Sequence, residues 1–256
     1  MHRLAIVVST VGYHWEELFQ AYWVFRDEGY EIDFYTVNGK AARADPLSLT
    51  KTGPLSLLGL GLPRSIAPET SRGKGLVASL NDVKALSSLD PEEMDALYLP
   101  GGHGCLFDVN RNSDLHAIIA RLYERDCILS GVCHATSTFA YVSVHEKSIV
   151  SGHALTGFPH ALDKILIKTG MVRREFLPLP LINDDKLKEA NANHSVLDEA
   201  LAIANPRHIK VSLPFITGVG PKSAAPVAHA LVEALNNRKV ENESRLQNRE
   251  VQGKPA

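Results

Sequence analysis

Short runs of apolar, often β-branched residues alternate with amphipathic segments along the chain. Residues 3–9 (RLAIVVS) form such a run, which is typical of a strand buried on both faces of a sheet. Residues 15–28 then place apolar side chains at helical spacing and end before Gly29, a common helix stop. Residues 31–36 (EIDFYT) alternate like a second strand. The pattern predicts a β-α-β unit and therefore an α/β fold on a mostly parallel sheet.

The same alternation resumes after a segment rich in Gly, Pro and Ser. Residues 39–78 have little periodicity, so we expect an insertion that leaves the sheet. The elements predicted beyond it are a short helix at 81–86, a strand at 95–99, a helix at 113–125 capped by Ser113, a strand at 127–130, helical segments at 160–168 and 184–204, a strand at 209–216 and a helix at 223–235. Residues 237–256 are polar without apolar periodicity and are expected to be disordered, which leaves one domain over residues 1–236.

Composition narrows the class of protein. A hydrophobic share of 45% suits a globular core, and a net charge of −2 without clustered Lys or Arg argues against nucleic acid as a partner. No apolar stretch approaches the roughly 18 residues that a membrane helix needs, and the N-terminal residues do not resemble a signal peptide. Three cysteines are too few for a disulfide framework. We therefore expect a cytoplasmic protein with free thiols and no membrane contact.

The junction after the strand at 127–130 carries the candidate chemistry. This strand runs into GVCHA at 131–135 and then into an expected helix, which is the cysteine counterpart of the Gly-x-Ser-x-Gly nucleophile elbow. The dipole at a helix N-terminus stabilises a thiolate, so we predict a nucleophilic Cys133 with a lowered pKa. The alternative is a buried cysteine that behaves as a small hydrophobe. We keep that interpretation for Cys105 and Cys127, which lack such a context.

Other candidate groups lie at the ends of neighbouring strands. Glycines after the strand at 95–99 let a ligand approach the backbone, so Gly102, His103 and Gly104 are predicted to bind substrate or an oxyanion, together with the N–H of His134. His134 itself is a candidate acid or base. Glu16 and Glu17 open the first helix, where either could be a general base or a charge that stabilises the helix end. The eleven histidines form no spaced ligand set, so no metal site is expected.

Five stretches of the chain resemble a known family. They are FRDEGYEIDFYT at 25–36, LPGGHGCLFD at 99–108, GVCHA at 131–135, ALTGFP at 154–159 and ITGVGPKSA at 216–224. In this order they resemble the ThiJ/PfpI superfamily, and within it the glutathione-independent glyoxalase III branch, which includes stress-induced, chaperone-like proteins. Residues 39–78 and 165–208 match poorly, so the resemblance does not specify the physiological substrate.

This resemblance implies a fold, a site and a reaction. The fold would be a flavodoxin-like, class I glutamine amidotransferase-like three-layer sandwich. Cys133 would be the nucleophile, Glu17 the acid beneath it, His134 its histidine and Asp163 the acid that orients that histidine, where many relatives have Glu. The reaction would convert a 2-oxoaldehyde such as methylglyoxal to a 2-hydroxy acid such as lactate through a hemithioacetal, as a lyase of the D-lactate dehydratase type. No metal, glutathione or other cofactor is implied, and the protein would be a homodimer.

Three other functions are compatible with the same residues. The elbow also suits hydration or hydrolysis of another small metabolite, such as an amide or an isonitrile. A chaperone would bind exposed apolar segments without using Cys133. A redox sensor would oxidise Cys133 to sulfenic or sulfinic acid.

Overall fold

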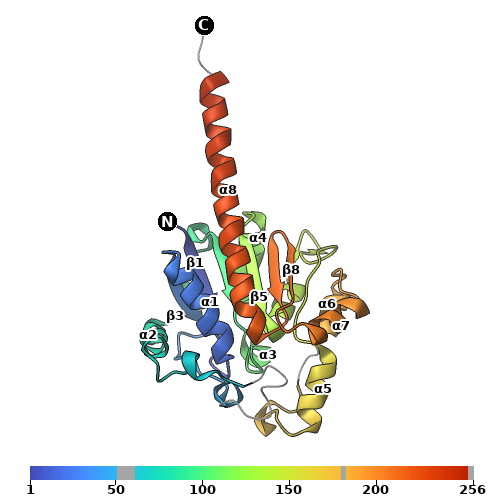
Figure 1. The fold of residues 1–256 in the computed structure, drawn as a ribbon. Helices are drawn as coiled ribbons and strands as arrows, with labels where there is room; N and C mark the ends of the chain where they lie inside the picture. The colour runs from blue at the N-terminus through green and yellow to red at the C-terminus, as the bar shows by residue number, and fades with distance from the viewer. Residues whose placement is uncertain (51–60, 180–182, 253–256) are drawn as a thin grey trace.

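A seven-stranded sheet runs through the computed structural model, which describes residues 1–50, 61–179 and 183–252 (Figure 1). The strands lie in the order β3, β2, β1, β4, β5, β9, β8, and every neighbouring pair is parallel except β9 and β8. Their bounds are β1 Arg3–Val7, β2 Glu31–Thr36, β3 Lys84–Ala85, β4 Ala96–Leu99, β5 Ile128–Val132, β8 Ile209–Ser212 and β9 Phe215–Gly218. A short antiparallel pair, β6 (Ser143–Val144) and β7 (Lys147–Ser148), lies outside this sheet.

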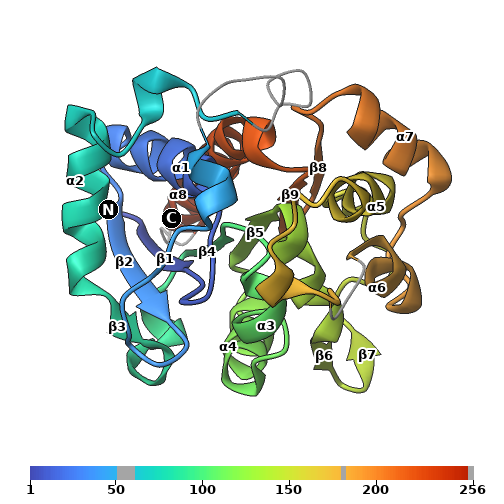
Figure 2. The same cartoon turned by 90° about the horizontal axis from the view of Figure 1, so that it is seen from below.

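Helices cover both faces of the sheet. On one face α1 (Trp15–Asp27) packs against α8 (Ala224–Gln252), with α2 (Ser71–Ser79) beside α1 (Figure 2). The other face is covered by α3 (Cys105–Asp108), α4 (Ser113–Glu124) and the 3-10 helix η7 (Cys133–Tyr141). Three more helices, α5 (His160–Lys168), α6 (Asn183–Glu189) and α7 (Val196–Ala204), lie near the end of the sheet formed by β9 and β8. The result is the α/β fold that the sequence pattern predicted, in the flavodoxin-like three-layer form that the family resemblance implies.

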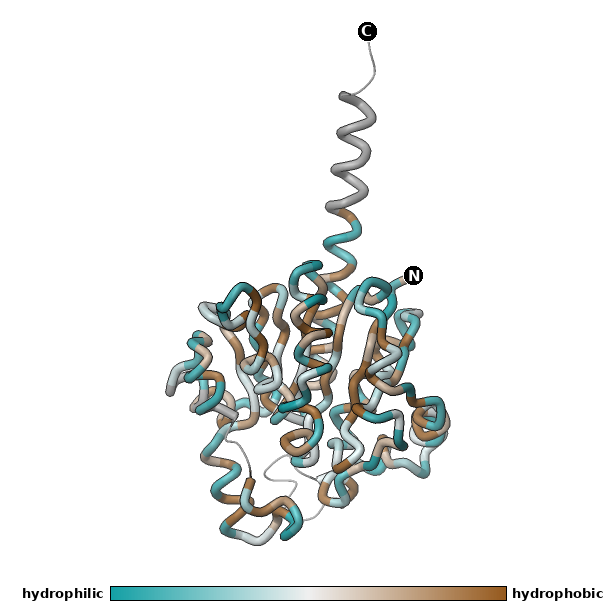
Figure 3. Tube along the Cα trace, turned by 180° about the vertical axis from the view of Figure 1, so that it is seen from behind, coloured by the Kyte–Doolittle hydropathy of each residue, from teal (hydrophilic) through white to brown (hydrophobic). Residues whose placement is uncertain are grey.

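The central strands explain why the sheet is buried on both faces. In β4, Ala96 and Tyr98 face the layer of α1 and α8, whereas Leu97 and Leu99 face the layer of α4 and η7. Such strands are hydrophobic without alternation, and the hydropathy colouring shows apolar positions concentrated inside the molecule (Figure 3). The Tyr98 hydroxyl donates to the backbone oxygen of Glu17 at 3.0 Å. This bond ties the first turn of α1 to the centre of the sheet, next to the end of β5.

Two predicted elements differ from the structure. The strand expected at 209–216 is an antiparallel pair, because Leu213 and Pro214 form a turn between Ser212 and Phe215, and Pro has no N–H for a strand ladder. The helix expected at 81–86 is not formed, because a 3-10 turn at Leu80–Asp82 is followed by strand β3, whereas α2 lies before it, inside the expected insertion. Thr70 caps α2 by accepting from the N–H of Gly73. A Cβ at Gly73 would overlap the carbonyl oxygen of Ala67, so this glycine permits a close backbone approach rather than breaking the helix.

Helix ends also differ from the prediction. Helix α4 is capped by Asn112, whose side chain accepts from the N–H of Leu115, and not by Ser113. Residues 237–252 were expected in a disordered tail, but α8 continues through Gln252. A helix already formed against the sheet extends at little cost per residue through sequence rich in Glu and Arg. Of the insertion expected at 39–78, residues 51–60 lie outside the described part. No described helix is long and apolar enough to cross a bilayer.

Replacing Gly104 with Ala should destabilise the fold. The N–H of Gly104 donates to the carbonyl oxygen of Gly12 at 3.0 Å, and a Cβ at Gly104 would overlap the Gly12 backbone. We expect the free energy of unfolding to fall by about 2 kcal/mol or more, measured by urea denaturation. Gly75→Ala in α2 is the control, since its Cβ would meet only the Trp23 ring at 3.3 Å. Equal stability of the Gly104→Ala variant and the wild type would contradict the close backbone crossing.

Candidate active site

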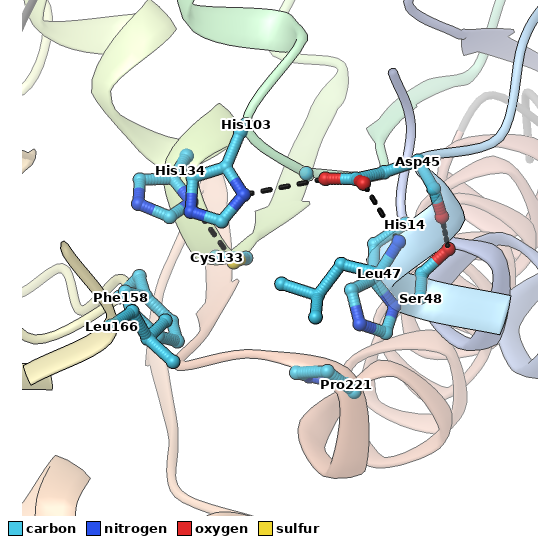
Figure 4. A pocket seen from close by; sticks show the side chains of 11 residues that line it. His14, Asp45, Leu47, Ser48, His103, Cys133, His134, Phe158, Leu166 and Pro221 are labelled. Atoms are coloured by element: carbon cyan, nitrogen blue, oxygen red, sulfur yellow. Dashed lines mark hydrogen bonds and ion pairs between the residues drawn. The ribbon is translucent and has the colours of Figure 1, made fainter. Parts of the chain in front are cut away.

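Cys133 lies where β5 ends and η7 begins, in the strained backbone expected of a nucleophile elbow. Its φ is 59°, a left-handed conformation that residues other than Gly rarely adopt. Gly101 faces it from the end of β4, and a Cβ there would lie 2.7 Å from the Cβ of Cys133. Only a glycine at position 101 leaves room for the side chain of Cys133. Cys133 is 3% exposed and lines a pocket together with Gly102, His103, His134 and Phe158 (Figure 4).

The imidazole of His134 joins the sulfur to Asp163. Its Nδ1 lies 3.3 Å from the Cys133 sulfur, and its Nε2 lies 3.0 and 3.1 Å from the two carboxylate oxygens of Asp163. Adjacent residues on a regular helix point apart, but the left-handed backbone at Cys133 brings the two side chains together. Asp163 projects from the first turn of α5 and is buried. The shorter aspartate side chain thus reaches the histidine.

The carboxyl of Glu17 is fully buried beneath the elbow. Its Oε2 accepts the N–H of Gly101 at 2.7 Å, and its Oε1 lies 4.0 Å from Nδ1 of His14. Burial raises the pKa of Glu17 to about 8, because hydrogen bonds from Gly101 and Cys133 only partly offset the loss of water. Glu17 is therefore largely protonated at neutral pH.

Glu16 has a different environment, which separates the two residues that the sequence left as alternatives. Its Oε1 accepts from Lys222 at 2.7 Å and from Gln20 at 2.8 Å. These bonds link α1 to the segment before α8 and leave Glu17 as the carboxyl that faces the sulfur.

The pKa of Cys133 runs opposite to the prediction of a lowered value. Burial raises it well above its ordinary value, and the nearby Glu17 carboxylate raises it further, while a hydrogen bond from the His134 N–H lowers it. The segment after Cys133 is a 3-10 helix, not the expected α-helix. Loss of water outweighs the stabilisation that the helix end provides. The thiolate must therefore form by proton transfer within the site.

The glycine loop after β4 contributes one of its two predicted glycines to the pocket. Gly102 lines the pocket with a φ of 111°, and a Cβ there would lie 2.6 Å from the Gly12 carbonyl oxygen and from the His14 nitrogen. Gly104 does not line the pocket, and its N–H is already bonded to Gly12. Close backbone packing against Gly12 is by itself a sufficient reason for a glycine at position 104, and a substrate contact there stays a prediction.

His103 borders the pocket, beside two residues that the sequence analysis missed. Nδ1 of His103 lies 3.3 Å from Oδ2 of Asp45, and burial lowers the pKa of His14 to about 3, so His14 is neutral. Asp45 was hidden within the expected insertion, although Asp followed by Pro46 is a sequence signal for a helix start. His14 follows β1 at the carboxyl edge of the sheet, where ligands bind in this fold class.

Possible metal ligands in the site are His103, His134 and Asp163, whose nearest donor atoms lie within 4.8 Å of one another. His134 and Asp163 already hydrogen-bond to each other. A metal ion would have to displace the proton between them, so the arrangement fits a histidine oriented by a carboxylate better than a ligand set.

Comparisons with known proteins find curated relatives over most of the chain. No protein-family model matches the chain. It is 25% identical over 229 residues to Glutathione-independent glyoxalase hsp3101 of Schizosaccharomyces pombe, covering 88% of this chain and 87% of that protein. It is 23% identical to Glyoxalase 3 of Candida albicans, covering 83% and 84%. The resemblance to the glutathione-independent glyoxalases is confirmed.

Solved structures of the ThiJ/PfpI superfamily share the fold. The crystal structure of glyoxalase III from Candida albicans matches with a TM-score of 0.69 and 22% identity, covering 91% of this chain and 97% of that one. A ThiJ/PfpI domain protein from Brachyspira murdochii matches with a TM-score of 0.58 and 18% identity, covering 92% and 96%. These likenesses establish the class I glutamine amidotransferase-like fold.

Glu17→Gln should stabilise the folded protein as pH rises. Glu17 ionises near its ordinary pKa of 4.5 in the unfolded chain but at about 8 in the folded one. The stability contributed by the neutral carboxyl is therefore complete below pH 4.5 and is lost as pH rises through 8. Gln cannot ionise, so the variant should gain on the order of a few kcal/mol over wild type by pH 8 and little at pH 4. Urea denaturation across this range measures the difference, and a constant difference would contradict the buried protonated state.

Alkylation of Cys133 should report the same interaction. We expect iodoacetamide to react with a midpoint pH above that of an ordinary cysteine, because burial raises the pKa of Cys133. Glu17→Gln should lower this midpoint, since it removes a carboxylate that repels the thiolate. Glu16→Gln is the matched control and should change it less, because Glu16 is paired with Lys222. A wild-type midpoint below that of a free cysteine would contradict this description.

Proposed function

We propose that this protein is a glutathione-independent glyoxalase that converts 2-oxoaldehydes such as methylglyoxal to 2-hydroxy acids. The observation that carries the proposal is the carboxyl of Glu17, fully buried beside Cys133 with its pKa raised to about 8. A carboxyl with such a pKa can both accept and return a proton near neutral pH, which an internal transfer between two carbons requires. The names of the curated relatives support the same activity.

The first step is addition of the Cys133 sulfur to the aldehyde carbon, C1. The thiol proton passes to Glu17 or to Nδ1 of His134, which lies 3.3 Å from the sulfur. The C–S bond forms as the C1 carbonyl becomes an oxyanion, which takes up a proton to give the hemithioacetal. The N–H groups of Gly102 and His134 stabilise the oxyanion, because both residues line the pocket together with Cys133. His103 contacts the remainder of the substrate.

The second step moves hydrogen from C1 to C2. Glu17, as carboxylate, removes the C1 proton while the C2 carbonyl oxygen takes up a proton, which gives an enediol. Glu17 then returns its proton to C2 as the C1 hydroxyl loses its proton, which leaves a thioester on Cys133. Water, with its proton taken by His134, then releases the 2-hydroxy acid and the thiol. C1 is oxidised by the two electrons that reduce C2, so no external oxidant or reductant is consumed. Asp163 holds the imidazole in the orientation that this hydrolysis needs.

The walls of the pocket suit a small carbonyl compound. Leu47, Phe158, Leu166 and Pro221 form apolar walls around the sulfur, and the Phe158 ring lies 4.7 Å from the His134 ring. Apolar walls exclude water from the enediol and limit the size of the group on C2. We also propose, from the family resemblance, that the enzyme is a lyase, that it is cytoplasmic and that it forms a homodimer. The raised pKa of Cys133 counts against a redox sensor, since the thiolate is the species that peroxide oxidises.

Turnover should depend on the sulfur and on Glu17. We expect Cys133→Ala to abolish formation of lactate from methylglyoxal, and Glu17→Gln to reduce kcat by about 100-fold or more, because the proton can no longer move between the carbons. Asp163→Asn should reduce kcat less, through the tautomer of His134. Enzymatic assay of lactate measures each rate.

The control for thiol loss is Cys127→Ala, which removes a buried cysteine in the core and should leave turnover near wild type. Amides and isonitriles are tested in parallel. Lactate production that survives in Cys133→Ala, or turnover of an amide or isonitrile without turnover of methylglyoxal, would overturn the proposal.

A further inference from the structure

A second histidine–carboxylate pair faces the pocket beside the first. His103 and Asp45 are both buried, with Nδ1 of His103 3.3 Å from Oδ2 of Asp45. The other carboxylate oxygen of Asp45 accepts the N–H of Leu47 at 2.9 Å. Although burial opposes ionisation, the bonds from His103 and Leu47 hold the pKa of Asp45 below its usual value. Asp45 is thus a fixed anion that keeps a proton on Nδ1 of His103.

The other nitrogen of His103 has nothing to bond among the described residues. Nε2 is buried and makes no hydrogen bond there, while the imidazole stacks on Phe176 with 5.9 Å between ring centroids. Leaving a buried polar atom unpaired costs roughly 1–3 kcal/mol. Because Nδ1 is committed to Asp45, Nε2 is the atom that can exchange a proton with a molecule in the pocket.

The position of His103 assigns it to the outer part of a bound substrate. The His134 ring contacts the sulfur, and the His103 ring is displaced from it by 5.0 Å between centroids (Figure 4). A carbon bonded to the sulfur, and its oxygen, would lie beside Gly102 and His134, which line the pocket with Cys133. An oxygen on the following carbon would lie further from the sulfur, within reach of His103 and Asp45, which line the same pocket.

We propose that His103, positioned by Asp45, is the acid–base group for the second oxygen of a substrate with two adjacent carbonyls. This inference rests on the proposed glyoxalase function and assigns a residue to its slow step. As Glu17 removes the C1 proton, the C1–H electron pair forms the C1–C2 double bond and the C2 carbonyl pair moves to its oxygen. In its imidazolium form, paired with the Asp45 carboxylate, His103 donates the Nε2 proton to that oxygen and keeps the Nδ1 proton, which gives a neutral enediol. When Glu17 returns a proton to C2, the C1 hydroxyl loses its proton to Nε2 and C1 becomes the thioester carbonyl.

The division of labour also defines the substrate class. The first histidine pair, with the sulfur, requires an aldehyde that forms a hemithioacetal. The second pair requires an oxygen on the neighbouring carbon that becomes an alcohol in the product. Backbone N–H groups at the C1 oxygen and His103 at the C2 oxygen would each stabilise the negative charge that develops there, in a pocket that excludes water. The site therefore selects substrates by the oxygens on C1 and C2, and not by the group attached beyond C2.

The test separates addition of the sulfur from the proton transfer that follows. The full chain is prepared as wild type, His103→Gln, Asp45→Asn and the double variant, and kcat and KM are measured with methylglyoxal. Addition of the Cys133 sulfur to the aldehyde is measured separately, from the concentration of methylglyoxal that protects Cys133 from alkylation by iodoacetamide. We expect kcat to fall by about 100-fold in His103→Gln, with protection unchanged.

Asp45→Asn should lower kcat by about tenfold, because Asn still accepts from Leu47 but loses the charge that keeps the proton on Nδ1. The double variant should be no slower than His103→Gln alone, since Asp45 acts only through His103. If His103→Gln does not fold, kcat and the protection of Cys133 are measured in Asp45→Asn instead, and they test the proposal in the same way. His229→Gln on the exposed side of α8 is the control.

Three results would overturn the inference. A folded His103→Gln or Asp45→Asn variant with wild-type kcat removes the acid–base role while leaving the glyoxalase function intact. A variant that loses both kcat and the protection of Cys133 by methylglyoxal would show that His103 and Asp45 only shape the pocket. A wild-type protein that is inert towards methylglyoxal and other 2-oxoaldehydes overturns the proposed function, and this inference with it.

Discussion

A carboxyl and a thiol are buried together at the carboxyl edge of the central sheet. Neither Glu17 nor Cys133 has bulk solvent to stabilise its charged form, and the Glu17 carboxylate raises the pKa of Cys133 further. Ionisation of both together is therefore strongly disfavoured. This constraint makes proton transfer within the pocket the route to a thiolate. It also explains why Gly101 supplies a backbone N–H at this point and no side chain.

The sheet is what makes such an arrangement possible. Strands β1, β4 and β5 are adjacent and parallel, so their carboxyl ends bring the start of α1, the glycine loop and the elbow to one edge. The apolar layers on either face hold these three segments rigidly, and the Tyr98 hydroxyl fixes the first turn of α1. The positive φ of Cys133, the unpaired Nε2 of His103 and the buried Glu17 all oppose stability. The packed core of the rest of the domain offsets these costs.

Local patterns predicted much of this structure, and burial accounts for what they missed. The β-α-β start could be predicted from the periodicity of its apolar residues, and the elbow from the spacing of Gly131 and Cys133 after a strand. The turn at Leu213 and Pro214 was missed, because the alternation of Ile209, Val211, Leu213 and Phe215 continues through it. The pKa of Cys133 was predicted in the wrong direction, since a sequence shows the helix that follows but not the loss of water. Asp45 was missed for a related reason, as its partner His103 is distant in the chain.

The most direct test of the central claim is the protonation state of Glu17 in the resting protein. Infrared difference spectra between wild type and Glu17→Gln isolate the carbonyl stretch of this carboxylic acid as pH is varied. We predict a protonated band at pH 7 that disappears only as pH rises through about 8. A carboxylate signal already complete at pH 6 would contradict the account.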